Sequence, residues 1–252
     1  MSVLSAKRVR RLSLGLPVPN DIFQGFESGD FAVLHGNASS CIIFALSVRA
    51  QLPPEQGGLA SSVVFVDGGN LFNPYLVAEI ARAYGLDSRD ALERIHISRA
   101  FTAYQFSSLI LEKLDSTLKR HRARLLAVSD VTSLFLDRDI PKVEARELFV
   151  KACTKLSEIA LKEQTIVVAG YFPERRSRQG LFFEAVLFGK CNVLIRLKRM
   201  GRVLTLTLED HPHIKSLNMD FQVDQTPLAA FFGGANYGTN CSILQAGIGN
   251  RD

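Results

Sequence analysis

Apolar residues along this chain come in short runs separated by longer stretches of mixed character. The short runs predict strands over residues 31–35, 63–66, 94–97, 125–128 and 165–169. Two of them, 63–66 and 125–128, carry no polar residue, which is typical of strands covered on both faces. The longer stretches predict an apolar helix over residues 41–50 and amphipathic helices over residues 74–84, 101–120 and 141–162. This alternation predicts an α/β fold, a mostly parallel twisted sheet with helices on both faces.

The remaining segments complete the expected organisation. Residues 1–20 form a basic arm, and residues 21–27 are expected as a short helix or turn. Residues 170–180 read as a polar basic loop, and residues 193–197 and 203–208 as a C-terminal antiparallel hairpin. We therefore divide the chain into the arm (1–20), a core domain (21–225) and a mobile Gly/Asn-rich tail (226–252).

Composition and charge narrow the class of protein. The chain has 252 residues, 47% of them hydrophobic, and a net charge of +5, which permits nucleic acid as a partner without requiring it. The four cysteines show no spacing typical of zinc ligands, so we expect reduced thiols and no metal site. No apolar stretch is long enough to span a bilayer. We expect an intracellular protein without a membrane partner, cytoplasmic, or nuclear if the organism is a eukaryote.

The first predicted strand and helix are joined by five small residues, Gly36, Asn37, Ala38, Ser39 and Ser40. In α/β proteins this position often cradles phosphate, because glycines let the backbone close in, the helix N-terminus offers free N–H groups and a lysine adds charge. Here the loop is short and has no lysine. A nucleophilic role for the serines would need an acid–base partner nearby, so helix capping explains them better.

Several blocks of sequence, in order, resemble the core of the RecA/RadA family of strand-exchange recombinases. The blocks lie at Ala50–Gly58, Val63–Leu86, Ile97–Phe101, Leu125–Phe135 and Asn192–Pro212, and the resemblance covers residues 21–225. It implies a RecA-like fold with a closing hairpin. It also implies two kinds of partner, namely DNA and a recombinase or a sister paralogue.

The chain departs from the family pattern where nucleotide would bind. Ser39 stands where the family has the phosphate-loop lysine, and Gly69 stands where it has the glutamate that orients water. Ser129 replaces the acid of the magnesium shell. Asp130 follows it and would face away in a regular strand, whereas Asp67 is kept. The resemblance therefore implies a pseudo-ATPase with a degenerate nucleotide site, no catalytic residue and no cofactor.

Two basic segments are candidates for contact with DNA. The loop after residue 169 matches a family loop that faces DNA, and guanidinium groups there would bind phosphates of single-stranded DNA without reading its sequence. A solvated basic loop is an equally good interpretation, and for the N-terminal arm so is simple solubility. The candidate residues are Arg175, Arg176, Arg178, Lys7, Arg8, Arg10 and Arg11.

Three functions stay open at this point. The first is a non-catalytic paralogue that assists homologous recombination by binding DNA, a recombinase partner, or both. The second is a protein-only adaptor or regulator with a RecA-like fold and no DNA binding. The third is an ATPase with a rearranged site, in which Asp67 and Asp130 hold the metal and a neighbouring subunit supplies the lysine.

Overall fold

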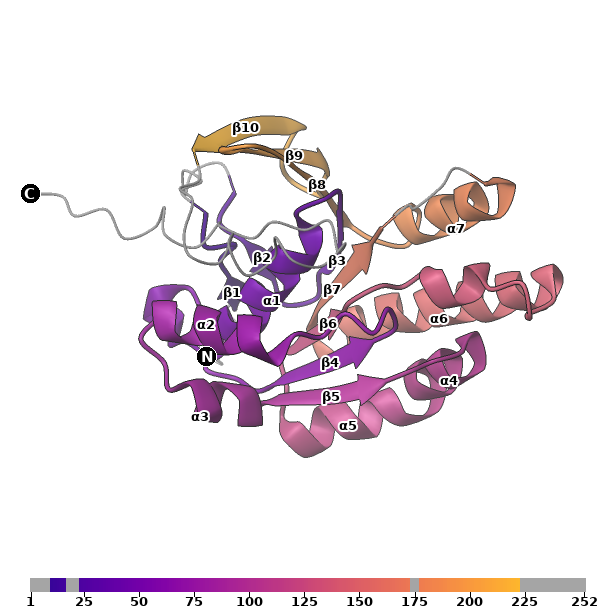
Figure 1. Ribbon diagram of the computed structural model, residues 1–252, viewed down its shortest axis with the longest axis horizontal. Coiled ribbons are helices and arrows are strands. Elements are labelled where there is room, and N and C mark those ends of the chain that lie inside the picture. Colours follow the sequence, from indigo (N-terminus) through magenta and orange to yellow (C-terminus); the bar gives the residue numbers. More distant parts are fainter. Residues whose placement is uncertain (1–9, 17–22, 173–176, 223–252) are drawn as a thin grey trace, which may run out of the picture.

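A computed structural model describes residues 10–16, 23–172 and 177–222 of the protein. Its centre is an eight-stranded sheet in the order β10-β9-β8-β3-β7-β6-β4-β5 (Figure 1). The six strands from β8 to β5 run parallel, whereas β8, β9 and β10 pair antiparallel. The strands are β3 (Phe31–His35), β4 (Val63–Asp67), β5 (Ile95–Arg99), β6 (Leu125–Val128), β7 (Ile166–Tyr171), β8 (Val193–Met200), β9 (Val203–Asp210) and β10 (Leu217–Gln222).

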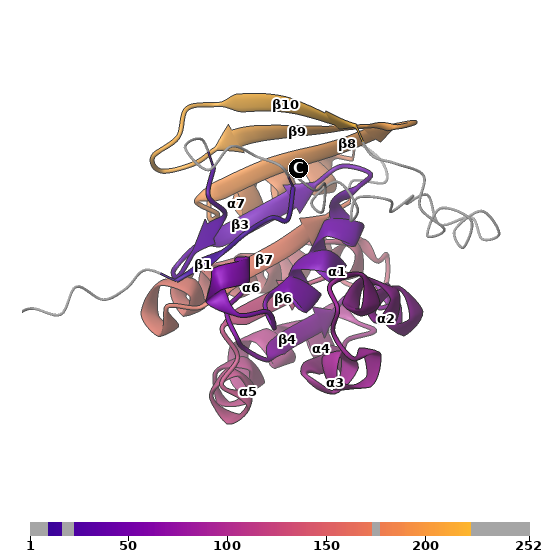
Figure 2. The ribbon, with the colours of Figure 1, turned by 90° about the vertical axis from the view of Figure 1, so that its left-hand side faces the viewer.

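Helices cover both faces of the sheet (Figures 1 and 2). One face carries α1, α2 and α3, and the other carries α4, α5, α6 and α7. The helices are α1 (Ser39–Arg49), α2 (Pro74–Ala83), α3 (Ser88–Glu93), α4 (Ala103–Ser108), α5 (Leu114–His121), α6 (Lys142–Glu163) and α7 (Arg178–Phe188). Short 3₁₀ turns lie at Pro54–Gln56 and Ser133–Leu136.

The central strand β3 shows why the sheet needs two helical layers. Its side chains alternate, so that Ala32 and Leu34 pack with α1 while Phe31 and Val33 pack with the α6 side. All four residues are buried. The same holds for every residue of β4, β6 and β7. The predicted α/β fold with a mostly parallel sheet and a closing antiparallel hairpin is therefore confirmed.

Several local predictions were wrong. Residues 26–27 are not helical but form β2 (Phe26–Glu27), which pairs with β1 (Arg11–Leu12). The helix expected over residues 101–120 is interrupted by a π-helical turn at Leu109–Lys113. The strand β10 and the helix α7 were not expected, and the predicted loop over 170–180 is shortened at both ends by β7 and α7.

The predicted tail, and residues 1–9 of the predicted arm, lie outside the described residues. Within the described segments, no helix combines the length and the apolar character needed to cross a bilayer.

Candidate functional site

The loop between β3 and α1 lies at the carboxyl end of the sheet, beside the neighbouring strand β8. Gly36 turns the chain there with φ of +100°. A β-carbon at this position would lie 2.3 Å from the carbonyl oxygen of Leu197 on β8. Only glycine permits both the backbone conformation and this approach. The glycine thus brings the loop against a strand, where the backbone of a phosphate-binding loop would close around phosphate.

Hydrogen bonds then fasten the loop to β8. The Ala38 N–H donates to the Leu197 carbonyl at 3.3 Å. The Asn37 amide pairs with the backbone of Arg199 in both directions, since its Nδ2 donates to the carbonyl at 2.9 Å and its Oδ1 accepts from the N–H at 2.7 Å. The Asn37 side chain therefore continues the hydrogen-bonded pairing of β3 with β8 past the end of β3.

The interior of the loop is filled by its own residues. Ser39 is buried, and its hydroxyl donates to the Gly36 carbonyl at 2.6 Å. The Ser39 N–H donates to the same carbonyl at 3.3 Å. Helix α1 begins at Ser39, two residues earlier than expected, and its N-cap is Ala38, with no side-chain capping bond. The prediction that the serines cap this helix was wrong, because Ser39 uses its hydroxyl to close the turn.

Asp67, at the end of β4, is completely buried and saturated with hydrogen bonds. Its Oδ1 accepts from the Leu71 N–H at 2.9 Å and from the Ser129 hydroxyl at 2.8 Å. Its Oδ2 accepts from the Phe72 N–H at 3.2 Å and from Arg99 Nε at 3.1 Å. This carboxylate holds together the turn after β4 and the ends of β5 and β6.

Gly69, Ser129 and Asp130 gather around Asp67. The Gly69 N–H lies 3.5 Å from the Ser129 hydroxyl, and a β-carbon on Gly69 would lie 3.0 Å from Cβ of Asp130. The Asp130 carboxylate turns into its own loop, where Oδ1 accepts from the N–H groups of Thr132 (2.9 Å) and Ser133 (3.2 Å). Burial raises the pKa of Asp130, and these hydrogen bonds oppose the rise. The two acids therefore stabilise separate turns.

Four residues of this site were not identified from the sequence. Leu197 and Arg199 of β8 receive the β3–α1 loop, and Arg99 of β5 pairs with Asp67. The fourth is Gly170 on β7, where a β-carbon would lie 2.2 Å from the Ser129 carbonyl and 2.8 Å from Ile43 of α1. That glycine lets the turn after β6 and helix α1 approach the strand between them.

A cavity of about 390 Å³ opens beside Gly69, between the ends of β4 and β5 and the turn after β6. Its wall includes Phe101, whose side chain is 64% exposed, and Leu136, which is 38% exposed. Ile97 on β5 is 44% exposed nearby in sequence, and β5 is the last strand of the sheet. This side of the described sheet therefore combines a strand that has a neighbour on one side alone with exposed apolar side chains.

The predicted DNA-binding residues fall in different places. Lys7, Arg8, Arg175 and Arg176 lie outside the described residues. Arg178 is exposed but begins helix α7, which Ser177 caps by accepting from the Gly180 N–H at 2.9 Å. The loop prediction was wrong for this arginine.

The arm arginines Arg10 and Arg11 lie at the other end of the molecule, next to the start of β1. Arg11 is paired with Glu27 at 2.7 Å, whereas Arg10 is exposed and has no carboxylate partner in the described segments. Arg10 and Arg11 therefore do not adjoin the β3–α1 loop, which lies at the carboxyl ends of the parallel strands.

A mostly parallel sheet, covered by helices on both faces and closed by an antiparallel hairpin, defines the class of this protein as a RecA-like core. The loop after β3 occupies the place where that class holds phosphate. The Rad51 family model matches residues 19–161, more than half of the chain. The protein belongs to the Rad51 family, and is thus a recombination- and repair-related RecA-like protein, in a family whose general partners are DNA and recombinases.

Proposed function

We propose that this protein is a non-catalytic paralogue within the Rad51 family, which assists homologous recombination by binding DNA, a recombinase partner, or both. The observation that carries this proposal is the β3–α1 loop, whose donors are directed at β8 and at the loop itself. Ala38 donates to Leu197, and the Ser39 hydroxyl and N–H both donate to Gly36. A phosphate in this loop would have to displace these bonds.

The charge around the loop supports the same proposal. Residues 36–40 contain no lysine or arginine. Arg196, which pairs with His35 just before the loop, is engaged with Glu209 at 3.2 Å, and Glu209 also contacts His35 at 2.8 Å. Phosphoryl transfer depends on fixed positive charge at the β- and γ-phosphates. The loop itself supplies none.

Nucleotide binding tests the non-catalytic part. Titration of the purified protein with a fluorescent ATP analogue and Mg²⁺ should show no saturable binding in the micromolar range, and DNA should stimulate no hydrolysis. A companion variant, Ser39→Lys, restores the missing charge but leaves the loop bonded to β8, so it should not restore binding. Micromolar affinity or magnesium-dependent turnover in the natural sequence would defeat this part of the proposal.

The DNA part rests on the arginines around residue 178. We expect fluorescence anisotropy to show binding of single-stranded DNA that weakens with salt. Replacing Arg175, Arg176 and Arg178 by alanine should reduce the slope of log K against log salt by about 2, because each lost phosphate contact removes about 0.7. A charge-matched control replaces exposed residues of other helical segments, Arg82, Lys113 and Arg120. If both triple variants bind alike, the arginines around residue 178 have no part in DNA binding.

The exposed edge of β5 favours a protein partner, and with it the protein-only adaptor as a second candidate function. An unpaired strand edge accepts a strand from another chain, and exposed Ile97 and Phe101 add apolar contact there. Binding of a purified Rad51-family recombinase from the same organism should be lost on Ile97→Glu and kept on Leu161→Glu, which alters a more exposed leucine of α6. A bound recombinase without any DNA binding at low salt would select the adaptor.

The rearranged ATPase is the least supported of the three. Its metal ligands would be Asp67 and Asp130, and every oxygen of Asp67 already accepts two hydrogen bonds. Asp130 Oδ1 is bonded within its own turn. A metal site would need both turns to rearrange.

A further inference from the structure

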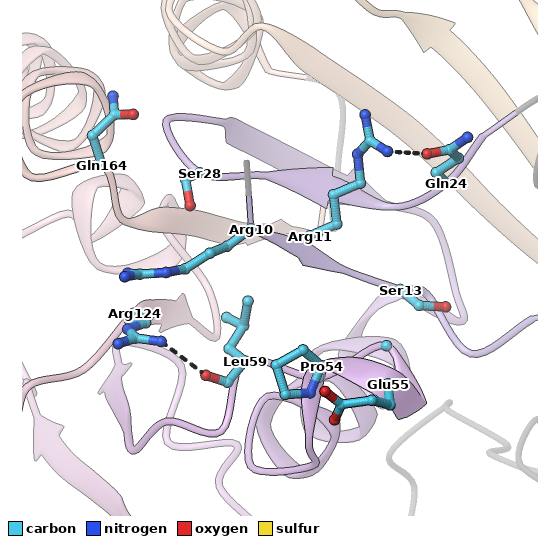
Figure 3. A pocket seen from close by; sticks show the side chains of 12 residues that line it. Arg10, Arg11, Ser13, Gln24, Ser28, Pro54, Glu55, Leu59, Arg124 and Gln164 are labelled. Carbon is cyan, nitrogen blue, oxygen red and sulfur yellow. Dashed lines mark hydrogen bonds between the residues drawn. The ribbon is translucent and has the colours of Figure 1, made fainter. Parts of the chain in front are cut away.

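A second concave site lies at the amino ends of the parallel strands (Figure 3). Residues 36–40 follow the carboxyl end of β3, so the two sites lie at opposite ends of the sheet. Its volume is about 680 Å³, within the range of about 300–1,000 Å³ that is typical of ligand pockets. Ser28 precedes β3, Arg124 precedes β6 and Gln164 precedes β7, so consecutive strand starts contribute one residue each. Arg10, next to β1, completes this wall.

Two guanidinium groups meet in this pocket without a counter-ion. Figure 3 shows the side chains of Arg10 and Arg124 ending close to one another, while Arg11 turns away to Gln24. In the described segments, no carboxylate comes within ion-pair distance of Arg10 or Arg124, and Arg124 makes one side-chain hydrogen bond, to the Leu59 carbonyl at 3.2 Å. Burial, and secondarily the charge of Arg10, lower the pKa of Arg124. An anion between the two groups would relieve this repulsion.

The lining of the pocket selects the kind of anion. Three backbone carbonyls of the lining already accept hydrogen bonds, because the Ser13 N–H donates to Gly57, the Ser28 N–H donates to Arg10, and the Arg124 guanidinium donates to Leu59. The charged groups that remain on this wall are the guanidinium groups of Arg10 and Arg124. Glu55, the one acid of the lining, lies beside Pro54 on the other side of the pocket in Figure 3. No aromatic ring is among the lining residues that the structure describes, so the pocket offers nothing on which a base could stack.

We propose that Arg10 and Arg124 form a phosphate-binding site, which takes backbone phosphates of a DNA strand without reading its sequence. This inference rests on the proposed DNA-binding function and adds to it a residue, Arg124, that no sequence pattern indicated. Two guanidinium groups can each donate a charge-assisted pair of hydrogen bonds to phosphate oxygens.

The test uses the full chain, fluorescent oligo-dT and a set of matched variants. The double variant Arg10→Ala/Arg124→Ala should bind about tenfold more weakly and lower the salt slope by about 1.4. The control Arg82→Ala/Lys113→Ala removes the same charge from α2 and the π-helical turn, and should bind like the natural protein. The single variant Arg10→Ala guards against misfolding, because the Arg10 side chain is exposed and makes no described hydrogen bond. It should give about half of the change in slope, and Arg10→Lys/Arg124→Lys should restore most of the affinity.

The outcomes separate this inference from the broader proposal. If Arg10→Ala/Arg124→Ala binds DNA as tightly as the control Arg82→Ala/Lys113→Ala, the proposal that this pocket binds DNA is wrong. The separate proposal that DNA binds through Arg178 is then unaffected. No DNA binding by the natural protein at low salt would overturn both. A direct readout is the NMR signal of Arg124 Nε–H, which oligo-dT should shift. If tripolyphosphate shifts it and oligo-dT does not, the pocket takes a free phosphate compound and the DNA proposal for it is wrong.

Discussion

Replacing Asp67 by asparagine tests whether this buried acid is structural or belongs to a working metal site. The carboxylate is fully buried and accepts four hydrogen bonds from the β4, β5 and β6 region. If its role is to join these turns, Asp67→Asn must cost stability. If it were kept for a metal, removal of a buried negative charge would cost little or would stabilise the protein.

The magnitude follows from the partners. The N–H groups of Leu71 and Phe72 and the hydroxyl of Ser129 lie in part-buried or buried surroundings, and each loses a charged acceptor worth about 1.5–3 kcal/mol. Asparagine keeps one acceptor oxygen but turns an NH₂ group toward the remaining donors. Arg99 is 39% exposed, so water replaces most of its interaction and its share is at most about 1 kcal/mol. Because such terms do not add, we expect a loss of about 2–4 kcal/mol in the free energy of unfolding.

Urea unfolding followed by circular dichroism measures this loss as a shift in midpoint at constant m-value. The control is Asp139→Asn, an exposed acid whose side chain makes no described contact, and it should stay within about 0.5 kcal/mol. A double-mutant cycle of Asp67→Asn with Ser129→Ala should show a coupling of about 1–2 kcal/mol, since the two side chains are 2.8 Å apart. An Asp67→Asn protein as stable as the natural one would refute the structural role.

Three further predictions concern a glycine pair, the thiols and one histidine. Gly36→Ala should lower the free energy of unfolding, measured in urea, by about 2–4 kcal/mol, because it adds a clash with Leu197 to the strain of positive φ. Gly85→Ala, at φ of +70° with nothing within 4 Å, should lower it by only about 1 kcal/mol. Equal losses in the two variants would contradict the contact of Gly36 with β8. Burial raises the pKa of the Cys153 thiol, and it raises the pKa of the Cys191 thiol to about 12. Mass spectrometry should therefore find both thiols unmodified after treatment of the native protein with iodoacetamide at pH 8. Rapid labelling of either thiol would contradict this packing. Burial, and secondarily the charge of the stacked His121 ring, lower the pKa of His96 below its usual 6.5. The unfolded state therefore takes up the proton first, and the free energy of unfolding should fall as the pH drops below 6.5. His96→Gln should flatten this pH dependence, and an unchanged profile would rule out the histidine pair as its source.

The sequence indicated the central layers of this fold because burial leaves a local pattern. Strands β3, β4 and β6 are buried on both faces, and their continuous apolar runs predicted them within one residue at each end. The strand β10 escaped prediction because it alternates exposed and half-buried residues at the edge of the sheet. The pair β1–β2 has two residues per strand and depends on contacts between distant parts of the chain, such as Arg11 with Glu27.

The candidate site likewise has one feature that is visible in the sequence and others that arise only when the chain folds. The absence of a lysine from residues 36–40 is visible in the sequence. The hydrogen bonds of Asn37 to Arg199 join residues 162 positions apart, and they depend on the register between β3 and β8, which no local pattern encodes. The pocket between Arg10 and Arg124 was equally hidden, because the two arginines become neighbours only when the β1–β2 pair folds beside the starts of the parallel strands.

The closed loop also bears on the possibility that a neighbouring subunit supplies the missing lysine. Such a lysine would restore the charge but not the donors, because Ala38 N–H, Ser39 N–H and the Ser39 hydroxyl already bond to Leu197 and Gly36. Releasing three hydrogen bonds at about 1 kcal/mol each costs about 3 kcal/mol, which weakens nucleotide binding by a factor of about 150 before any contact with the lysine is counted. Gly36, moreover, is held against β8 by its backbone conformation. A donated lysine therefore acts on ATP only if β8 also withdraws from the loop. Ser39→Lys adds the charge and removes the hydroxyl bond to Gly36, but it keeps the bonds of Ala38 and Asn37 to β8, so it distinguishes a missing residue from a closed site.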